Sequence, residues 1–173
     1  MSSEILSNGH FFSPSKGNLT LDQVIKEIFG YMQELPEYQY EVIVGCDSPS
    51  SDKPFFPIAV VVLRTGAGGR FFLKKMQYPD SFLKRFANIN WKNRILQEVY
   101  LSCELALSLK EELEKENKIG LKYQFEYIHA DVGEKGKTKE MVKEVMGLIK
   151  SNGFEPRIKP QSFAASVVAD RYT

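Results

Sequence analysis

Four carboxylates stand where they could act together: Asp47, Glu98, Asp131 and Asp170. Each is expected at the end of a buried strand or beside the apolar stripe of a helix, where a carboxylate is costly unless a cation pairs with it. Four carboxylates gathered at one place cannot all stay ionised without cations. Oxygen ligands of this kind favour Mg²⁺ or Mn²⁺. Two such ions about 3.5–4 Å apart can activate a water molecule and stabilise the leaving oxygen of a phosphodiester.

Asp47 follows a short apolar run, residues 41–46, that predicts a buried central strand. Side chains alternate faces along a strand, so Ile43, Gly45 and Asp47 share one face, and Gly45 leaves room beside the carboxylate. The alternative is structural, because Asp47 could simply cap the turn that it forms with Ser48 and Pro49. A second aspartate, Asp131, ends the alternating strand predicted over residues 122–130.

The other two carboxylates are expected on helices. Asp170 lies three residues after Val167 on the last predicted helix, which places it on the apolar face near a C-terminus that disfavours negative charge. Glu98 neighbours the apolar stripe of a long helix predicted over residues 91–117. Glu104 is the alternative on the same helix. Residues six apart differ by about 240° in direction, so only one of the two can point into the site, and we expect Glu98.

The predicted elements define an α/β fold. A helix over residues 20–35 is followed by strands at 41–46, 58–63 and 70–76, and the glycine-rich turn at 65–69 makes an antiparallel meander the economical arrangement. Helices and strands then alternate to the end of the chain. We therefore predict a single domain with a mixed five-stranded sheet and helices on both faces, preceded by an irregular N-terminal arm over residues 1–18.

Composition limits the classes of function. The chain of 173 residues carries a formal net charge of +1, so bulk charge predicts neither a nucleic-acid nor a membrane partner. Its first 20 residues are polar and no apolar run approaches the roughly 20 residues of a membrane span, so we expect a cytoplasmic protein without a signal peptide. The two cysteines, Cys46 and Cys103, lie in apolar runs and are expected to be reduced core residues.

The sequence resembles the YkuK-type family of bacterial proteins, to which a ribonuclease H-like fold and a predicted nuclease role are assigned. The resemblance covers nearly the whole chain, from the arm around Phe12 to Thr173. Its motifs are Val44-Gly45-Cys46-Asp47-Ser48, His129-Ala130-Asp131-Val132-Gly133, Gly136-Lys137-Thr138 and Lys159-Pro160-Gln161-Ser162-Phe163-Ala164-Ala165-Ser166. The order of Asp47, Glu98, Asp131 and Asp170 matches the metal ligands of the ribonuclease H-like superfamily. Proofreading-type exonucleases of that superfamily carry a glutamate where this chain has Pro49, so the exonuclease subclass is not supported.

Other residues near these motifs are candidates for supporting roles. His129 precedes Asp131 by two residues and could move a proton or orient a phosphate, or it could be a core histidine, and both readings stay open. Lys137 and Lys159 could contact backbone phosphates, as could Ser48 beside Asp47. The Gly-Lys-Thr sequence at Lys137 lacks the upstream glycine spacing of a P-loop. Thr138 is expected to cap the helix that follows.

We therefore expect a divalent-metal-dependent nuclease that acts on RNA or DNA, with Asp47, Glu98, Asp131 and Asp170 as ligands of Mg²⁺ or Mn²⁺. The alternative is a non-catalytic module that binds nucleic acid or protein and has kept the fold. The near-zero net charge favours the module, whereas the buried carboxylates favour the nuclease. A sugar-kinase or actin-type ATPase shares the sheet topology but needs two such domains, for which 173 residues are too few.

Overall fold

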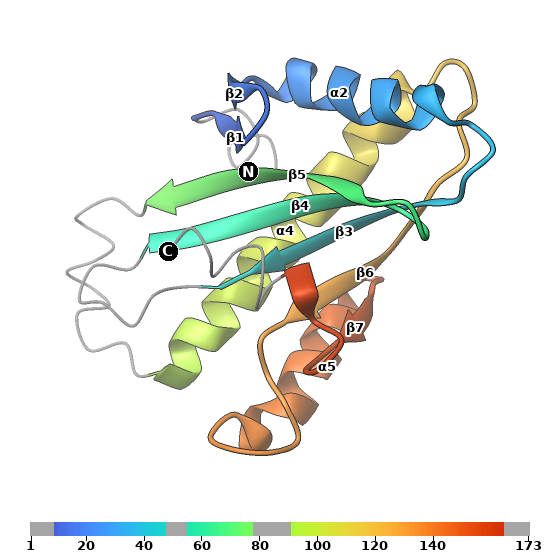
Figure 1. Cartoon of the computed structure of the whole chain (residues 1–173). Coiled ribbons are helices and arrows are strands. Elements are labelled where there is room, and N and C mark those ends of the chain that lie inside the picture. Colours follow the sequence, from blue (N-terminus) through green and yellow to red (C-terminus); the bar gives the residue numbers. More distant parts are fainter. Residues whose placement is uncertain (1–8, 48–54, 78–90, 165–173) are drawn as a thin grey trace.

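The computed structural model describes residues 9–47, 55–77 and 91–164 (Figure 1). No helix within these ranges is long and apolar enough to cross a membrane. The elements in chain order are β1 (Phe11–Ser13), β2 (Gly17–Leu19), α2 (Leu21–Glu34), β3 (Tyr40–Cys46), β4 (Phe55–Arg64), β5 (Gly69–Gln77), α4 (Trp91–Glu116), β6 (Gln124–Ala130), the 3₁₀ helix η1 (Lys139–Met141), α5 (Val142–Ser151) and β7 (Glu155–Arg157).

The described strands form one mixed sheet with the order β2-β1-β5-β4-β3-β6-β7. Strands β3, β4 and β5 pair antiparallel in sequence order, which confirms the predicted meander. Strand β6 then returns parallel to β3, and β7 lies parallel to β6. A parallel return of this kind needs a crossover, and α4 and α5 provide the two crossovers. As a result, β3 has an antiparallel neighbour on one side and a parallel neighbour on the other.

The prediction of five strands and an irregular arm is wrong at the N-terminal edge. Residues 11–19 form the hairpin β1–β2, and β1 pairs antiparallel with β5 through Phe11 opposite Lys74. The side chain of Phe11 is fully buried, and Gly17 has a positive φ of 74° where the chain enters β2. The sequence signal was weak because three-residue strands are too short to show an alternating pattern.

The two faces of the sheet are covered differently. Val42 and Val44 of β3 face a large core to which α2, α4 and α5 all contribute, so the three helices pack on one face. On the other face Ile43 and Val61 pack with Ala164, where the chain becomes helical at residue 163. Figure 1 shows α4 behind the sheet and this short C-terminal segment in front of it. The rest of the last predicted helix lies outside the described residues.

Two predicted helix caps have different outcomes. At Thr20 the capping box is confirmed, because Gln23 N–H donates to Thr20 Oγ1 at 3.3 Å and Thr20 N–H donates to Gln23 Oε1 at 2.8 Å. The cap predicted at Thr138 is wrong. Thr138 makes no side-chain cap bond, and its Oγ1 accepts instead from Gly133 N–H at 3.0 Å. That bond closes the loop between β6 and η1, so the hydroxyl shapes the loop rather than the helix.

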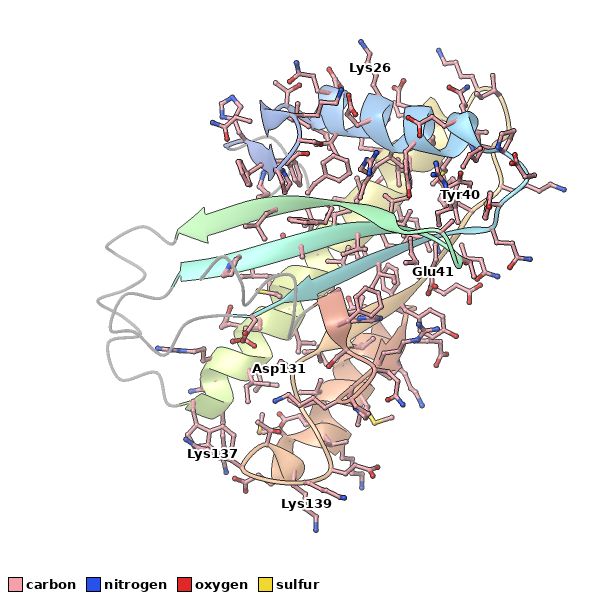
Figure 2. The ribbon with its side chains drawn as sticks, in the orientation of Figure 1. Lys26, Tyr40, Glu41, Asp131, Lys137 and Lys139 are labelled. Atoms are coloured by element: carbon pink, nitrogen blue, oxygen red, sulfur yellow. The ribbon has the colours of Figure 1, made fainter. Side chains whose placement is uncertain are left out.

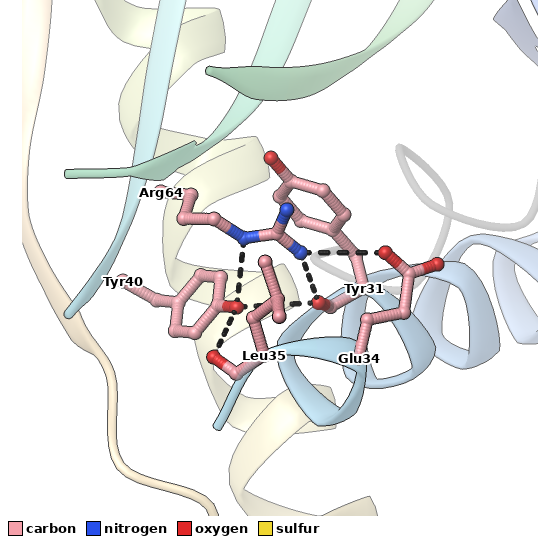
Figure 3. A network of polar contacts seen from close by, with 5 residues as sticks. All are labelled: Tyr31, Glu34, Leu35, Tyr40 and Arg64. Carbon is pink, nitrogen blue, oxygen red and sulfur yellow. Dashed lines mark hydrogen bonds and ion pairs between the residues drawn. The ribbon is translucent and has the colours of Figure 1, made fainter. Parts of the chain in front are cut away.

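A buried arginine ties α2 to the sheet (Figure 3). Arg64, at the end of β4, is 7% exposed and donates from Nη2 to Tyr31 O at 2.8 Å and from Nε to Tyr40 Oη at 2.9 Å. Tyr40 Oη in turn donates to Leu35 O at 2.8 Å. The last turn of α2 holds no basic residue, so its carbonyls receive their hydrogen bonds from the sheet. The guanidinium also stacks on the Tyr31 ring, 3.9 Å from its centroid.

Replacing Arg64 by Lys is expected to lower the melting temperature by about 5 °C, because an ammonium cannot make both hydrogen bonds while stacking on a ring. The matched control is Arg70→Lys. Arg70 belongs to β5 of the same sheet and is exposed, and its guanidinium carbon lies 4.8 Å from the centroid of the Tyr31 ring. Thermal melts of both variants check this. Equal melting temperatures would show that positive charge alone, without the fork of hydrogen bonds, holds the end of α2.

Candidate active site

The sheet brings two of the predicted aspartates to one edge. Strands β3 and β6 run parallel, with Gly45 opposite His129 and Cys46 opposite Ala130. Asp47 and Asp131 are the next residues on these neighbouring strands, which lie about 4.8 Å apart in such a ladder. The two aspartates therefore follow adjacent strands at one edge of the sheet. That their carboxyl groups lie close enough to share one metal ion stays a prediction. In Figure 2, Asp131 lies where β6 ends.

Glu98 is the buried carboxylate of α4. Its side chain is 7% exposed, whereas Glu104 is only half-buried. Burial raises the pKa of the Cys46 thiol well above its ordinary value, and the negative charges of Glu98 and Asp47 raise it further. Both carboxylates therefore lie within electrostatic reach of Cys46, the last residue of β3. The choice of Glu98 over Glu104 as a ligand stays a prediction, and the burial of Glu98 favours it.

Asp131 has a cationic neighbour. Its Oδ1 lies 3.1 Å from Nζ of Lys159, with 23% of the aspartate side chain and 48% of the lysine side chain exposed. The backbone of Lys159 is fixed by its N–H, which donates to Val132 O at 2.8 Å. Lys159 was predicted to contact phosphate, and the structure places its ammonium directly at the carboxylate edge. An ammonium at this position occupies space in which a cation would approach Asp131.

The His129 side chain is buried and fixed by its neighbours, which limits its access to a substrate proton. It is 1% exposed, its Nδ1 accepts from Ala164 N–H at 3.2 Å, and its ring packs edge-to-face on Phe163 with centroids 4.7 Å apart. Burial, followed by the positive charge of Arg157, lowers the His129 pKa to about 4. The ring is therefore neutral at pH 7, with its proton on Nε2. These contacts favour a structural role, and a catalytic role for His129 stays a prediction.

The loop that follows Asp131 meets the first turn of α4. Lys137 Nζ lies 4.9 Å from the ring centroid of Trp91, and Lys92 Nζ lies 5.6 Å from it. Lys92 also pairs with Glu140 at 3.2 Å. Lys137 was predicted as a phosphate contact, but Trp91 was missed. The available signal was that Trp91, the single tryptophan of the chain, stands seven residues before Glu98 and hence on a similar face of the helix.

The chemistry of these donors fits a hard divalent cation. Asp47, Glu98 and Asp131 supply carboxylate oxygens from neighbouring elements, and one oxygen of Asp131 already faces a positive charge. Within residues 9–47, 55–77 and 91–164, however, no three His, Cys, Asp or Glu side chains are grouped closely enough to hold a metal ion. Two further predicted residues, Asp170 and Ser48, lie outside the described residues.

Residues 23–173 match the family described as Ribonuclease H-like. The chain belongs to the ribonuclease H-like family. It is also similar to "Uncharacterized protein YkuK" of Bacillus subtilis (strain 168), with 28% identity over 166 residues that cover 94% of this chain and 96% of that protein. No solved structure matches the chain significantly. The resemblance seen in the sequence motifs is thus confirmed over nearly the full length of this ribonuclease H-like chain.

Proposed function

We propose that the protein is a divalent-metal-dependent nuclease that hydrolyses phosphodiester bonds of RNA or DNA. The observation that carries the proposal is the position of Asp47 and Asp131 directly after adjacent parallel strands, with the buried Glu98 within electrostatic reach of Cys46 at the end of one of them. Membership of the ribonuclease H-like family supports the same reading. An aspartate directly after each of two adjacent strands, with a buried glutamate on the helix behind them, is an arrangement typical of a functional site.

Asp47, Glu98, Asp131 and Asp170 would hold Mg²⁺ or Mn²⁺. The chemistry supplied by such ions is activation of the attacking water and neutralisation of charge on the phosphodiester oxygens. Two residues of the protein, Lys159 and His129, would support the metal ligands. Lys159 limits the repulsion at Asp131 before a cation binds, and its ammonium would contact a phosphate of the substrate. His129 holds the backbone of Ala164, six residues before Asp170 in the sequence.

The direct test is hydrolysis of labelled single-stranded and duplex RNA and DNA by the purified protein. Cleavage is expected with Mn²⁺ or Mg²⁺ and not with EDTA, and Asp131→Asn is expected to lose it. Cleavage that survives both EDTA and this substitution would come from a contaminant or a different site. Absence of cleavage with either metal on all four substrates would refute the nuclease proposal.

The second candidate function is a non-catalytic binding module with the same fold. The ion pair between Lys159 and Asp131 favours it, because a carboxylate neutralised by an ammonium needs no metal ion. The two functions differ in what the ion pair does. In a nuclease the ammonium competes with the cation for Asp131, whereas in a binding module it is simply part of the surface.

Replacing Lys159 by Gln separates these functions. Removing a positive charge 3.1 Å from Asp131 Oδ1 is expected to tighten Mn²⁺ binding by about three- to tenfold, a modest change because the lysine is about half exposed. Isothermal titration calorimetry without nucleic acid measures it. The control is Lys26→Gln, an exposed lysine of α2 that Figure 2 places far from Asp131. Unchanged Mn²⁺ affinity would mean that Asp131 is not a ligand.

A further inference from the structure

Three lysines line an open groove on the exposed side of η1 and α5. The groove has a volume of about 780 Å³, and its lining includes Lys139, Lys143 and Lys150. On an ideal α-helix Lys143 and Lys150 of α5 differ by about 20° in direction, and Lys139, on the 3₁₀ helix η1 that leads into α5, lines the same groove, so the three lysines form a row along one side. The row is roughly 17 Å long at the helical rise per residue. Figure 2 shows Lys139 pointing away from the body of the protein.

The floor of the groove is apolar. Val142 and Met146 line it below the lysines, and Gly147 contributes no side chain. No heavy atom lies within 4 Å of the position that a Cβ on Gly147 would take, so the space above this glycine is open. An apolar floor with a cationic border suits a strand whose bases and sugars are accessible and whose phosphates are charged. A duplex hides its bases and presents mainly phosphates.

Positive charge is concentrated here although the whole chain is nearly neutral. Residues 134–150 contain five lysines and three glutamates. Glu140 is paired with Lys92 at 3.2 Å, and Glu134 is the carboxylate that lines the groove. The row of lysines therefore faces an environment in which cations predominate, as is needed for binding a polyanion.

The groove is connected to the carboxylate edge by a short ordered loop. This loop begins after Asp131, is closed by the hydrogen bond from Gly133 N–H to Thr138 Oγ1 at 3.0 Å, and continues into η1. It carries Lys137, whose ammonium lies 4.9 Å from the centroid of the Trp91 ring. A cation held near an aromatic ring keeps its position at low entropic cost. Lys137 thus adds a positive charge on the segment that joins Asp131 to the row of lysines.

We propose that the groove lined by Lys139, Lys143 and Lys150 binds the sugar-phosphate backbone of a single strand of nucleic acid and leads it to the carboxylate edge. The inference rests on the proposed function, because it names how the substrate of that site is held. The length of the row accommodates several phosphates, which lie about 3.4 Å apart along the axis of a stacked strand. The lysines bind charge and not base edges, so this binding is independent of sequence.

The test measures binding without catalysis. Fluorescein-labelled dT₂₀ and rU₂₀ are titrated with the full-length protein in EDTA, and anisotropy is read at several salt concentrations. The triple variant K139Q/K143Q/K150Q is expected to bind at least about tenfold more weakly, and its slope of log K against log salt is expected to be shallower by about 2. The charge-matched control K26Q/K118Q/K122Q removes three exposed lysines elsewhere and should change binding less than about twofold.

A second variant tests the groove without changing charge. Gly147→Phe fills the open space above the glycine, and its backbone needs no positive φ. It is expected to weaken oligonucleotide binding several-fold while keeping the wild-type salt slope. Wild-type affinity in both the triple variant and Gly147→Phe would overturn the inference. The same conclusion would follow from equal losses in the triple variant and its control, or from binding to anionic phosphatidylserine vesicles in preference to the oligonucleotides.

The outcomes distinguish this inference from the nuclease proposal. If the lysine row binds the oligonucleotides but the wild type never cleaves them with Mn²⁺ or Mg²⁺, the binding role of the groove is supported and the nuclease proposal fails. If the wild type cleaves but the triple variant binds normally, the nuclease proposal is supported and the proposed binding role of the groove is refuted. If the wild type neither binds nor cleaves, both are refuted.

Discussion

Replacing Asp47 by Asn is expected to abolish metal-dependent hydrolysis and most of the thermal stabilisation that Mn²⁺ gives the wild type. The substitution removes one negative charge and one strong ligand from the end of β3. A cation that binds only the folded state stabilises it by about 2.7 kcal/mol at a hundred times its dissociation constant. For a chain of this size that corresponds to a rise of about 5–10 °C in melting temperature. The Asn variant should show little of this rise and should lose at least about a hundredfold in activity.

Without metal the same variant should melt at or above the wild type. Asp47 and Glu98 both lie close enough to Cys46 to raise the pKa of its thiol, so they also repel each other. If Asp47 only caps a turn, Asn replaces it nearly as well and the response to Mn²⁺ is unchanged. Thermal melts with and without Mn²⁺ separate these cases, and an unchanged metal response would exclude Asp47 as a ligand.

The pair Glu98→Gln and Glu104→Gln provides the matched control. Both changes remove one carboxylate from α4 and keep its shape, but only Glu98 is deeply buried beside the end of β3. The loss of metal response should therefore follow Glu98→Gln alone. A loss in Glu104→Gln of similar size would mean that the response reflects the charge of the helix and not a site.

The central strands could be predicted because their sequence signals are local and strong. The apolar runs of β3 and β4, the glycine-rich turn before β5 and the capping box at Thr20 each depend on residues that are close in the chain. The hairpin β1–β2 could not, because its stability comes from distant partners. Phe11 is buried only because β5 lies beside it, with Lys74 opposite. Tertiary contacts decide such short strands, and sequence pattern does not.

The same distinction applies to the candidate site. Asp47 and Asp131 were recognisable because each directly follows a predicted strand, an apolar run before Asp47 and an alternating one before Asp131, and such patterns are visible in a few residues. Two contacts of the site join residues far apart in the sequence: Lys159 pairs with Asp131, and Lys137 lies beside Trp91. No local sequence pattern predicts such contacts. The row of lysines on η1 and α5 has a helical spacing, but its significance depends on the open space at Gly147, which only the structure reveals.

Acidification is expected to destabilise the fold through His129. The folded protein holds the His129 pKa at about 4, because of burial and then the charge of Arg157, against an ordinary value of 6.5. The unfolded chain therefore binds a proton that the folded chain rejects, and stability falls as the pH is lowered. The loss begins near pH 6.5 and is complete near pH 4. A difference of this size corresponds to about 3 kcal/mol.

The structural reason lies in the contacts of the ring. Nδ1 accepts a hydrogen bond from Ala164 N–H at 3.2 Å. A proton on Nδ1 would turn it into a second donor, so this hydrogen bond would be lost and the two N–H groups would repel each other. Urea unfolding of the wild type and His129→Gln between pH 7 and 4 isolates the effect, because the carboxylates titrate in both proteins and cancel in the difference. The stability advantage of the wild type should shrink by about 3 kcal/mol across this window. A constant difference would show that His129 titrates alike in the folded and unfolded chains, and that its contact with Ala164 does not depend on its charge.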